Sequence, residues 1–315
     1  MNRALLFAVL WFVAAVHAQE IPGLMRIVVP FPPGGSNDVI ARMMAPALAK
    51  RLGTTVIVEN KPGAAGVLGS DAVAKASRDG STILLTSSTF LTAAATQARV
   101  PYDPIAAFAP VALIAQGPLL LAVPAGAPHK TPADLLQAAR ANPGTLNYGT
   151  AGVGSVAHLA SELLNANAGI RMTHVPYKGA ANAVLDLAAG QINVMLSGYS
   201  SIVPMLKSGK VRAIAVTSSQ PSPAFPDLPL LSGAVPGYSI EVWAGALAPA
   251  GTPPAFVDRL NREINEISAS PEMKVILEPD GSIPVAVNAA AFGARLREEL
   301  ALWKRIATER KISVD

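Results

Sequence analysis

Cysteine is absent from the 315-residue sequence, which excludes disulfide bonds and any chemistry that needs a thiolate. Aromatic residues are scarce at 5%, although 51% of the chain is hydrophobic, so Ala, Val, Leu and Ile must fill the core. The four histidines show no zinc-binding spacing such as HExxH, and no paired carboxylates indicate glycoside hydrolysis. We therefore expect no metal ion, no cofactor and no catalytic residues.

The one long apolar run lies at the N-terminus. Residues 1–3 carry a positive charge, residues 4–16 are apolar, and Val16 and Ala18 are the small residues expected before a cleavage site. This pattern predicts a signal peptide over residues 1–18 and export to the periplasm. An uncleaved membrane anchor is the alternative, although the run is short for a bilayer of about 30 Å.

Charge of one sign is also scarce. The formal net charge is +4, and loss of Arg3 with the signal peptide leaves 4 − 1 = +3. Basic and acidic residues alternate between residues 295 and 305, which is typical of a solvated helix face. We expect no nucleic-acid partner, because such a partner requires a clustered basic surface.

Strand and helix patterns alternate along the chain. Strands are predicted at residues 26–31, 55–58 and 82–86, with helices at 37–52 and 67–76 between them. A second alternating run extends from about 119 to 217, and helical patterns return from about 252. The alternation predicts an α/β fold with mainly parallel sheets, in two lobes joined by a hinge without a flexible linker.

A Gly-Gly loop follows the first predicted strand. Gly34 and Gly35 permit positive φ angles and a close backbone approach, and the helix that begins near Asn37 presents free N–H groups to an anion. The sequence is neither a Walker loop nor a dinucleotide fingerprint. An ordinary capped turn is the alternative interpretation.

A second loop of this kind lies in the second run, at residues 149–155. It also connects a strand to the start of a helix, so two anion-binding turns, one in each lobe, are expected to face one cleft. Such a pair predicts a small carboxylate ligand held by backbone amides and hydroxyls.

Five segments of the chain closely resemble the Bug family, the extracytoplasmic solute receptors of tripartite tricarboxylate transporters. They occur in the family's order and are residues 27–42 (IVVPFPPGGSNDVIAR), 59–69 (ENKPGAAGVLG), 147–162 (NYGTAGVGSVAHLASE), 174–179 (HVPYKG) and 243–253 (WAGALAPAGTP). The resemblance covers essentially the whole processed chain. One departure is Thr150, which stands where Ser is more usual and is expected to influence specificity.

The resemblance implies a type II periplasmic-binding-protein fold with a two-strand hinge. The implied first lobe comprises residues 19–121 and 246–315, and the second comprises residues 122–245. The ligand is expected in four loops, at Phe31, Pro32, Gly34, Gly35, Ser36 and Asp38; at Ser87, Ser88 and Thr89; at Thr150, Ala151, Gly152, Gly154 and Ser155; and at Ser197, Gly198, Tyr199 and Ser200.

The function that follows is a monomeric periplasmic receptor that delivers a small organic acid to membrane subunits of a tripartite tricarboxylate-type transporter. A ligand sensor for a signalling partner is an alternative. A secreted serine hydrolase is a weaker one, because Ser155 and His158 lack the Gly-x-Ser-x-Gly elbow and His158 is expected to pack beneath its loop. Whether Tyr177 or Lys178 reaches the ligand is left open.

Overall fold

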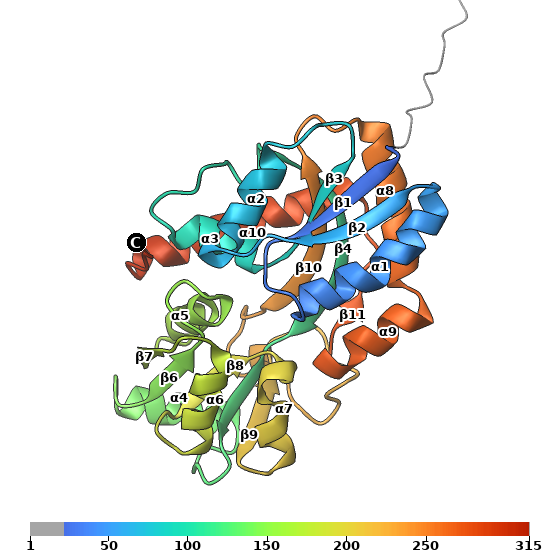
Figure 1. Ribbon diagram of the computed structural model, residues 1–315. Helices are drawn as coiled ribbons and strands as arrows, with labels where there is room; N and C mark the ends of the chain where they lie inside the picture. The colour runs from blue at the N-terminus through green and yellow to red at the C-terminus, as the bar shows by residue number, and fades with distance from the viewer. Residues whose placement is uncertain (1–21, 315) are drawn as a thin grey trace, which may run out of the picture.

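The computed structural model describes residues 22–314, and the predicted signal peptide lies outside this range. Two lobes, each built on its own β-sheet, meet at a narrow waist (Figure 1). Within residues 22–314, no helix is long and apolar enough to cross a membrane.

The larger lobe contains the two ends of the described chain. Its six-stranded sheet has the order β11-β4-β10-β3-β1-β2. The strands are β1 (Leu24–Val29), β2 (Thr55–Asn60), β3 (Thr82–Ser87), β4 (Phe108–Pro118), β10 (Glu241–Pro249) and β11 (Ile283–Pro284). The helices are α1 (Ser36–Leu52), α2 (Val67–Ala74), α3 (Thr89–Thr96), α8 (Pro254–Ser268), α9 (Pro271–Leu277) and α10 (Ala289–Glu309).

Helices cover both faces of this sheet. Buried residues of α1, α8 and α9 form one hydrophobic cluster with one face, and those of α2, α3 and α10 pack against the other. The apolar stripe of α10, formed by Phe292, Leu296, Leu300 and Trp303, is buried. Because helices cover both faces at the centre of the sheet, strands such as β4 and β10 are rich in Val, Leu and Ala on both sides.

The smaller lobe has a five-stranded sheet in the order β7-β6-β8-β5-β9. The strands are β5 (Leu120–Pro124), β6 (Asn147–Thr150), β7 (Thr173–Pro176), β8 (Val194–Ser197) and β9 (Val211–Val216). Its helices are α4 (Pro132–Ala141), α5 (Val156–Ala168), α6 (Ala180–Ala188) and α7 (Tyr199–Lys207). Helix α4 begins with a capping box formed by Thr131 and Asp134, since the side chain of each accepts from the backbone N–H of the other.

Both sheets are mixed, which differs from the expected mainly parallel arrangement. Strands β1, β2 and β3 pair in parallel, as do β6, β7 and β8. The strands next to the waist are antiparallel to their neighbours, namely β4 to β10 and β5 to β8 and β9. The reason is that one segment leaves the larger lobe and another returns to it, so β4 and β10 must run in opposite directions.

The chain crosses the waist slightly earlier at each point than the predicted lobe limits. Leu120 and Leu121 already pair with a strand of the smaller sheet. On the return, the chain pairs with β4 of the larger sheet from Glu241 onward. The crossings therefore fall around Leu119 and between Thr217 and Glu241.

Thr217 joins the two crossing segments. Its hydroxyl donates to the Ile240 carbonyl (2.6 Å) and accepts from the Leu119 amide (2.8 Å). Its own backbone amide donates to the Leu119 carbonyl (3.0 Å), and its carbonyl accepts from the Ile240 amide (2.9 Å). The residue is fully buried, so these four bonds fix the crossing without competition from water.

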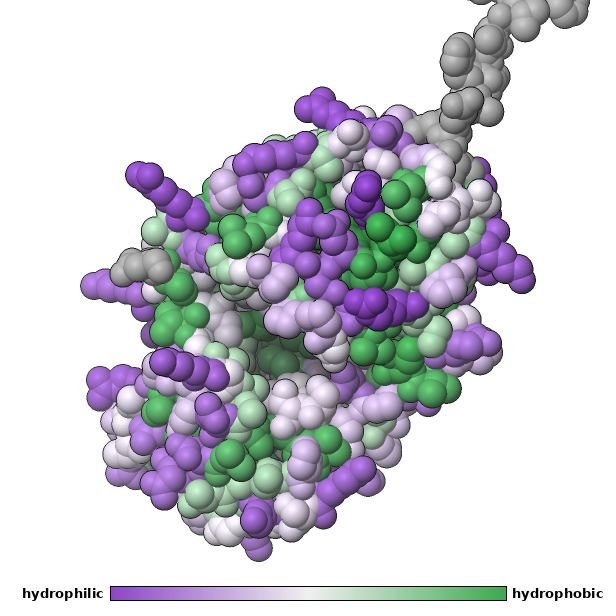
Figure 2. All heavy atoms as spheres, in the orientation of Figure 1, coloured by the Kyte–Doolittle hydropathy of each residue, from purple (hydrophilic) through white to green (hydrophobic). Residues whose placement is uncertain are grey.

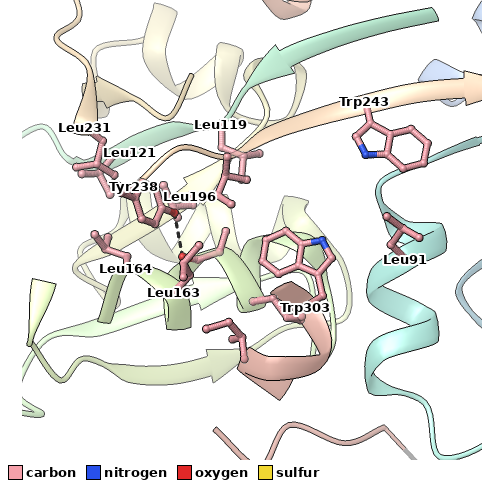
Figure 3. Packing of buried hydrophobic residues seen from close by; sticks show 14 of the residues in the cluster. Leu91, Leu119, Leu121, Leu163, Leu164, Leu196, Leu231, Tyr238, Trp243 and Trp303 are labelled. Atoms are coloured by element: carbon pink, nitrogen blue, oxygen red, sulfur yellow. Dashed lines mark hydrogen bonds between the residues drawn. The ribbon is translucent and has the colours of Figure 1, made fainter. Parts of the chain in front are cut away.

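A hydrophobic cluster continues across the waist beside these bonds. Leu91 and Trp303 of the larger lobe belong to the same cluster as Leu163 and Tyr238 (Figure 3). The buried Tyr238 hydroxyl donates to the Ala160 carbonyl of α5 (2.9 Å). In addition, Glu299 of α10 accepts from the indole N–H of Trp243 (2.8 Å) and of Trp303 (3.0 Å), and burial raises the pKa of this carboxyl.

Thr217→Val is expected to lower the free energy of unfolding by about 1–3 kcal/mol, because the buried Leu119 amide loses its acceptor while the side-chain shape is kept. Urea denaturation measures this change. Thr308→Val is the matched control, because Thr308 is exposed on α10. Removal of its hydroxyl is expected to lower the free energy of unfolding by less than about 0.5 kcal/mol. Equal effects of the two substitutions would show that the Thr217 hydroxyl does not stabilise the crossing.

Candidate functional site

A cavity of about 590 Å³ lies between the lobes. The start of α1, the waist strand β10, the end of α9 and the start of α7 surround it, and Figure 2 shows the surface hollowed between the lobes over hydrophobic side chains. Its lining residues are Phe31, Gly34, Gly35, Ser36, Asn37, Val39, Ile40, Ser87, Ala115, Pro118, Gly198, Tyr199, Ser200, Val242, Trp243, Ala244, Ile276, Leu277, Asp280 and Ser282.

The Gly-Gly loop is held in shape by Asp38. One oxygen of the buried carboxylate accepts from the Gly34 amide and from Arg42 Nε, both at 2.9 Å, and the other accepts from Asn60 Nδ2 at 2.9 Å. Asn60 Nδ2 also donates to the Phe31 carbonyl (3.1 Å). The hydrogen bond from Arg42 is the main cause that lowers the pKa of Asp38 to about 2. Asp38 therefore positions the loop and has no free oxygen for a ligand.

The start of α1 is open toward the cavity. Gly34 has φ of +86°, which a glycine adopts without strain, and Gly35 is the N-cap residue. No side chain caps this end of the helix, and Gly35, Ser36 and Asn37 all line the cavity. The first N–H groups of a 17-residue helix and the positive end of its dipole are thus available to an anion.

The residues of the turn after β3 contact two different places, the cavity and the waist strand β10. Ser87 lines the cavity. Ser88 is buried and its hydroxyl accepts from the Trp243 amide (2.9 Å), while its own amide donates to the Trp243 carbonyl (3.2 Å). Thr89 begins α3 and is not among the cavity residues. Ser88 thereby holds β10 at the cavity wall.

In the second-lobe loop, polar groups bond mainly to one another. Thr150 is fully buried, and its Oγ1 lies 2.7 Å from His174 Nε2. The Ser155 hydroxyl donates to the Gly152 carbonyl (2.8 Å) and accepts from the His158 amide (3.3 Å), so it caps α5. The loop does not line the cavity and instead approaches Thr96 and Val314 of the larger lobe at Gly154.

Two histidines support this loop from beneath. His158 is buried, and its Nδ1 accepts from the Gly154 amide (3.2 Å), as expected from the sequence. Its ring stacks on His174 with centroids 3.8 Å apart, and the Tyr148 ring packs against His174 with centroids 5.0 Å apart. Burial lowers the pKa of both histidines to about 4, so both rings are neutral at pH 7.

The turn between β8 and α7 brings the smaller lobe to the cavity. Gly198, Tyr199 and Ser200 line it, whereas Ser197 is buried at the end of β8. The Ser200 amide donates to Asp280 Oδ1 of the larger lobe (3.1 Å). This bond connects the two lobes directly across the cavity.

The structure thus brings eight of the expected residues to one cavity, namely Phe31, Gly34, Gly35, Ser36, Ser87, Gly198, Tyr199 and Ser200. Ten others lie outside its lining: Pro32, Asp38, Ser88, Thr89, Thr150, Ala151, Gly152, Gly154, Ser155 and Ser197. Tyr177 and Lys178 also lie outside, and the Tyr177 hydroxyl donates to Asp186 (2.7 Å).

The lining residues that the sequence did not predict come from α1, β4, β10 and the α9 region. The apolar ones, such as Val242 and Ile276, carry no pattern that separates a cavity wall from a core. Asn37 had a signal, because it stands at the first turn of the predicted helix. The Ser155 hydroxyl bonds to backbone groups only, so no side chain in the structure activates it as a nucleophile. Within residues 22–314, no group of three or more acidic or histidine side chains is arranged for a metal ion.

Sequence relatives cover nearly the whole chain. The sequence model described as "Tripartite tricarboxylate transporter family receptor" matches residues 40–312. A Pseudomonas sp. (strain P51) protein described as "UPF0065 protein in tcbD-tcbE intergenic region" is 40% identical over 91% of this chain and 86% of its own length. BugT of Bordetella pertussis is 33% identical over 94% of this chain and 92% of its own.

Solved structures agree with these relatives. MatC from Rhodopseudomonas palustris, with bound malate, is 31% identical with a TM-score of 0.73, covering 90% of this chain and 98% of that one. Rpa4515 from R. palustris, with adipate, is 33% identical with a TM-score of 0.77, covering 92% of this chain and 98% of that one. The chain belongs to the tripartite tricarboxylate transporter receptor family, the Bug family that its sequence motifs indicated.

Proposed function

We propose that this protein is a periplasmic receptor that binds a small carboxylate in the cavity between its lobes. The observation that carries the proposal is the start of α1, where Gly35, Ser36 and Asn37 line the cavity and no side chain caps the helix. A ligand carboxylate fits this place, because it supplies the acceptors that the helix end lacks. The apolar wall made by residues such as Val242 and Ile276 suits the ligand's carbon body.

The remaining expectations are part of the same proposal. The lobes are expected to close on the ligand by bending at the waist, and the second-lobe loop at Thr150–Ser155 joins the site only in that closed form. A monomer is expected to hand the ligand to membrane subunits of a tripartite tricarboxylate-type transporter. Support comes from relatives that hold adipate and malate. No catalytic step is proposed.

A sensor for a signalling partner is the second candidate, because the same closing cleft serves either role. The neighbouring genes distinguish transport from sensing, since transport requires genes for membrane subunits and sensing requires a sensor kinase.

Export to the periplasm is also part of the proposal. It is supported by the signal-peptide pattern of residues 1–18 together with the family.

A panel of mono-, di- and tricarboxylates is expected to include at least one acid that raises the melting temperature, because a ligand bound to the folded state stabilises it by mass action. Differential scanning fluorimetry measures the shift, with the matching alcohols and amides as controls that lack the carboxylate. The proposal is wrong if no acid of the panel stabilises the folded protein, or if the uncharged controls stabilise it equally.

Asn37→Asp is expected to weaken carboxylate binding at least about tenfold, because a fixed negative charge then stands at the start of α1 beside the ligand's own. The same change should leave the unfolding free energy equal or slightly higher, since an acid in the first turn favours the helix dipole. Titration calorimetry and urea denaturation measure the two effects. Asn167→Asp, at an exposed residue in the last turn of α5 and outside the cavity lining, is the control for affinity and should leave it within about twofold.

A further inference from the structure

Two helix N-termini reach the cavity, and they differ in whether they are occupied. Helix α1 has no side-chain cap. Helix α7, of nine residues, likewise has no cap from its own turn at Gly198, but the Asp280 carboxylate accepts from its Ser200 amide at 3.1 Å. A carboxylate of the protein therefore already holds one of the two places that suit an anion.

Asp280 also sets the charge of the cavity. Among the described residues that line it, Asp280 is the only one with a charged side chain, and no Lys, Arg or His is present. The nearest basic group of the Gly-Gly loop, Arg42, is paired with Asp38. A second anion placed near α7 would thus meet a like charge with no cation to offset it.

The walls on the Asp280 side are suited to an uncharged group. Ile276 and Leu277 of α9 precede Asp280 in the chain and line the cavity with it, as does Val242 of β10. The polar groups beside them are the hydroxyl-bearing Tyr199 and Ser282. These surroundings favour an apolar or neutral hydrogen-bonding end of a ligand over a carboxylate.

We infer that Asp280 selects ligands with a single carboxylate, which binds at α1, and rejects those with a second carboxylate at the α7 end. The inference rests on the proposed carboxylate site and names the class of acid that this site takes. It distinguishes this chain from the relatives that hold adipate and malate, both of which are dicarboxylates.

A dicarboxylate has two ways to enter, and both are unfavourable. If Asp280 keeps its hydrogen bond with the Ser200 amide, the second carboxylate lies beside a like charge. If the ligand displaces Asp280, the hydrogen bond between Asp280 and the Ser200 amide, which joins the two lobes across the cavity, is lost. The Asp280 carboxylate must then be solvated by water instead. A monocarboxylate keeps the bond and encounters neither cost.

Matched acids test the inference directly. Straight-chain monocarboxylates and dicarboxylates of four to eight carbons are titrated in pairs of equal length, for example hexanoate and adipate, against the full processed protein by calorimetry. For the pairs that bind, the monocarboxylate is expected to bind at least about tenfold more tightly.

Asp280→Asn identifies the cause, because Asn keeps an oxygen that can accept from the Ser200 amide while the charge is removed. In this variant the dicarboxylates should gain at least about tenfold in affinity, and the monocarboxylates should stay within about twofold. Glu278→Gln is the matched control. It removes a charge of the same sign from an exposed residue of the same turn, outside the cavity lining, and should change neither class. Melting temperatures of the unliganded variants verify that both are folded.

The inference is overturned if dicarboxylates bind the native protein as tightly as their monocarboxylate partners. It is also overturned if Asp280→Asn leaves the affinity for dicarboxylates unchanged, or if Glu278→Gln raises that affinity as much as Asp280→Asn does. Failure of every acid of both series, with the protein folded, would instead remove the proposed function together with the inference.

Discussion

The arrangement of the two lobes depends on the crossing at Thr217. Four hydrogen bonds of one buried residue join the segment that leaves the larger lobe at Leu119 to the segment that returns at Ile240. Because both segments are held at the same point, the lobes are expected to rotate about it instead of separating. The cavity lies beside this point and is walled by Pro118 and Val242, so its width follows from the same bonds.

The proposed recognition of a carboxylate in the cavity relies on backbone groups that other side chains hold in place. Asp38 and Ser88 do not line the cavity, yet Asp38 fixes the Gly34 turn and Ser88 fixes β10. The buried His158 does the same for Gly154 in the second-lobe loop. The proposed anion site has no basic side chain among the described lining residues. In this proposal the backbone amides supply the positive end, and the acids and hydroxyls behind them supply rigidity.

Local features of the fold were predictable, and distant contacts were not. The turn at Gly34, the helix after it and the capping box at Thr131 follow from short-range sequence rules, and the structure has all three. The helix over Thr89–Thr96 was missed because it is only eight residues long and its three Thr residues are weak helix formers. The Thr150 side chain is held by its contact with His174. The Ser200 amide at the start of α7 is bonded by Asp280, which lies 80 residues further along the chain. No local pattern predicts such contacts. The family resemblance indicated Thr150, His174 and Ser200, but not which residues they contact.

The bridge at Glu299 gives the protein an optical property. Both tryptophans within residues 22–314 donate their indole N–H to this one buried carboxyl, and Trp243 also lines the cavity. Both rings are almost fully buried in the core beside α10. Indole emission depends on the polarity around the ring, so exposure of this core to water changes the emission of both tryptophans. The protein thus carries a built-in pair of fluorophores, and the opening of the core around Glu299 is readable without an attached dye.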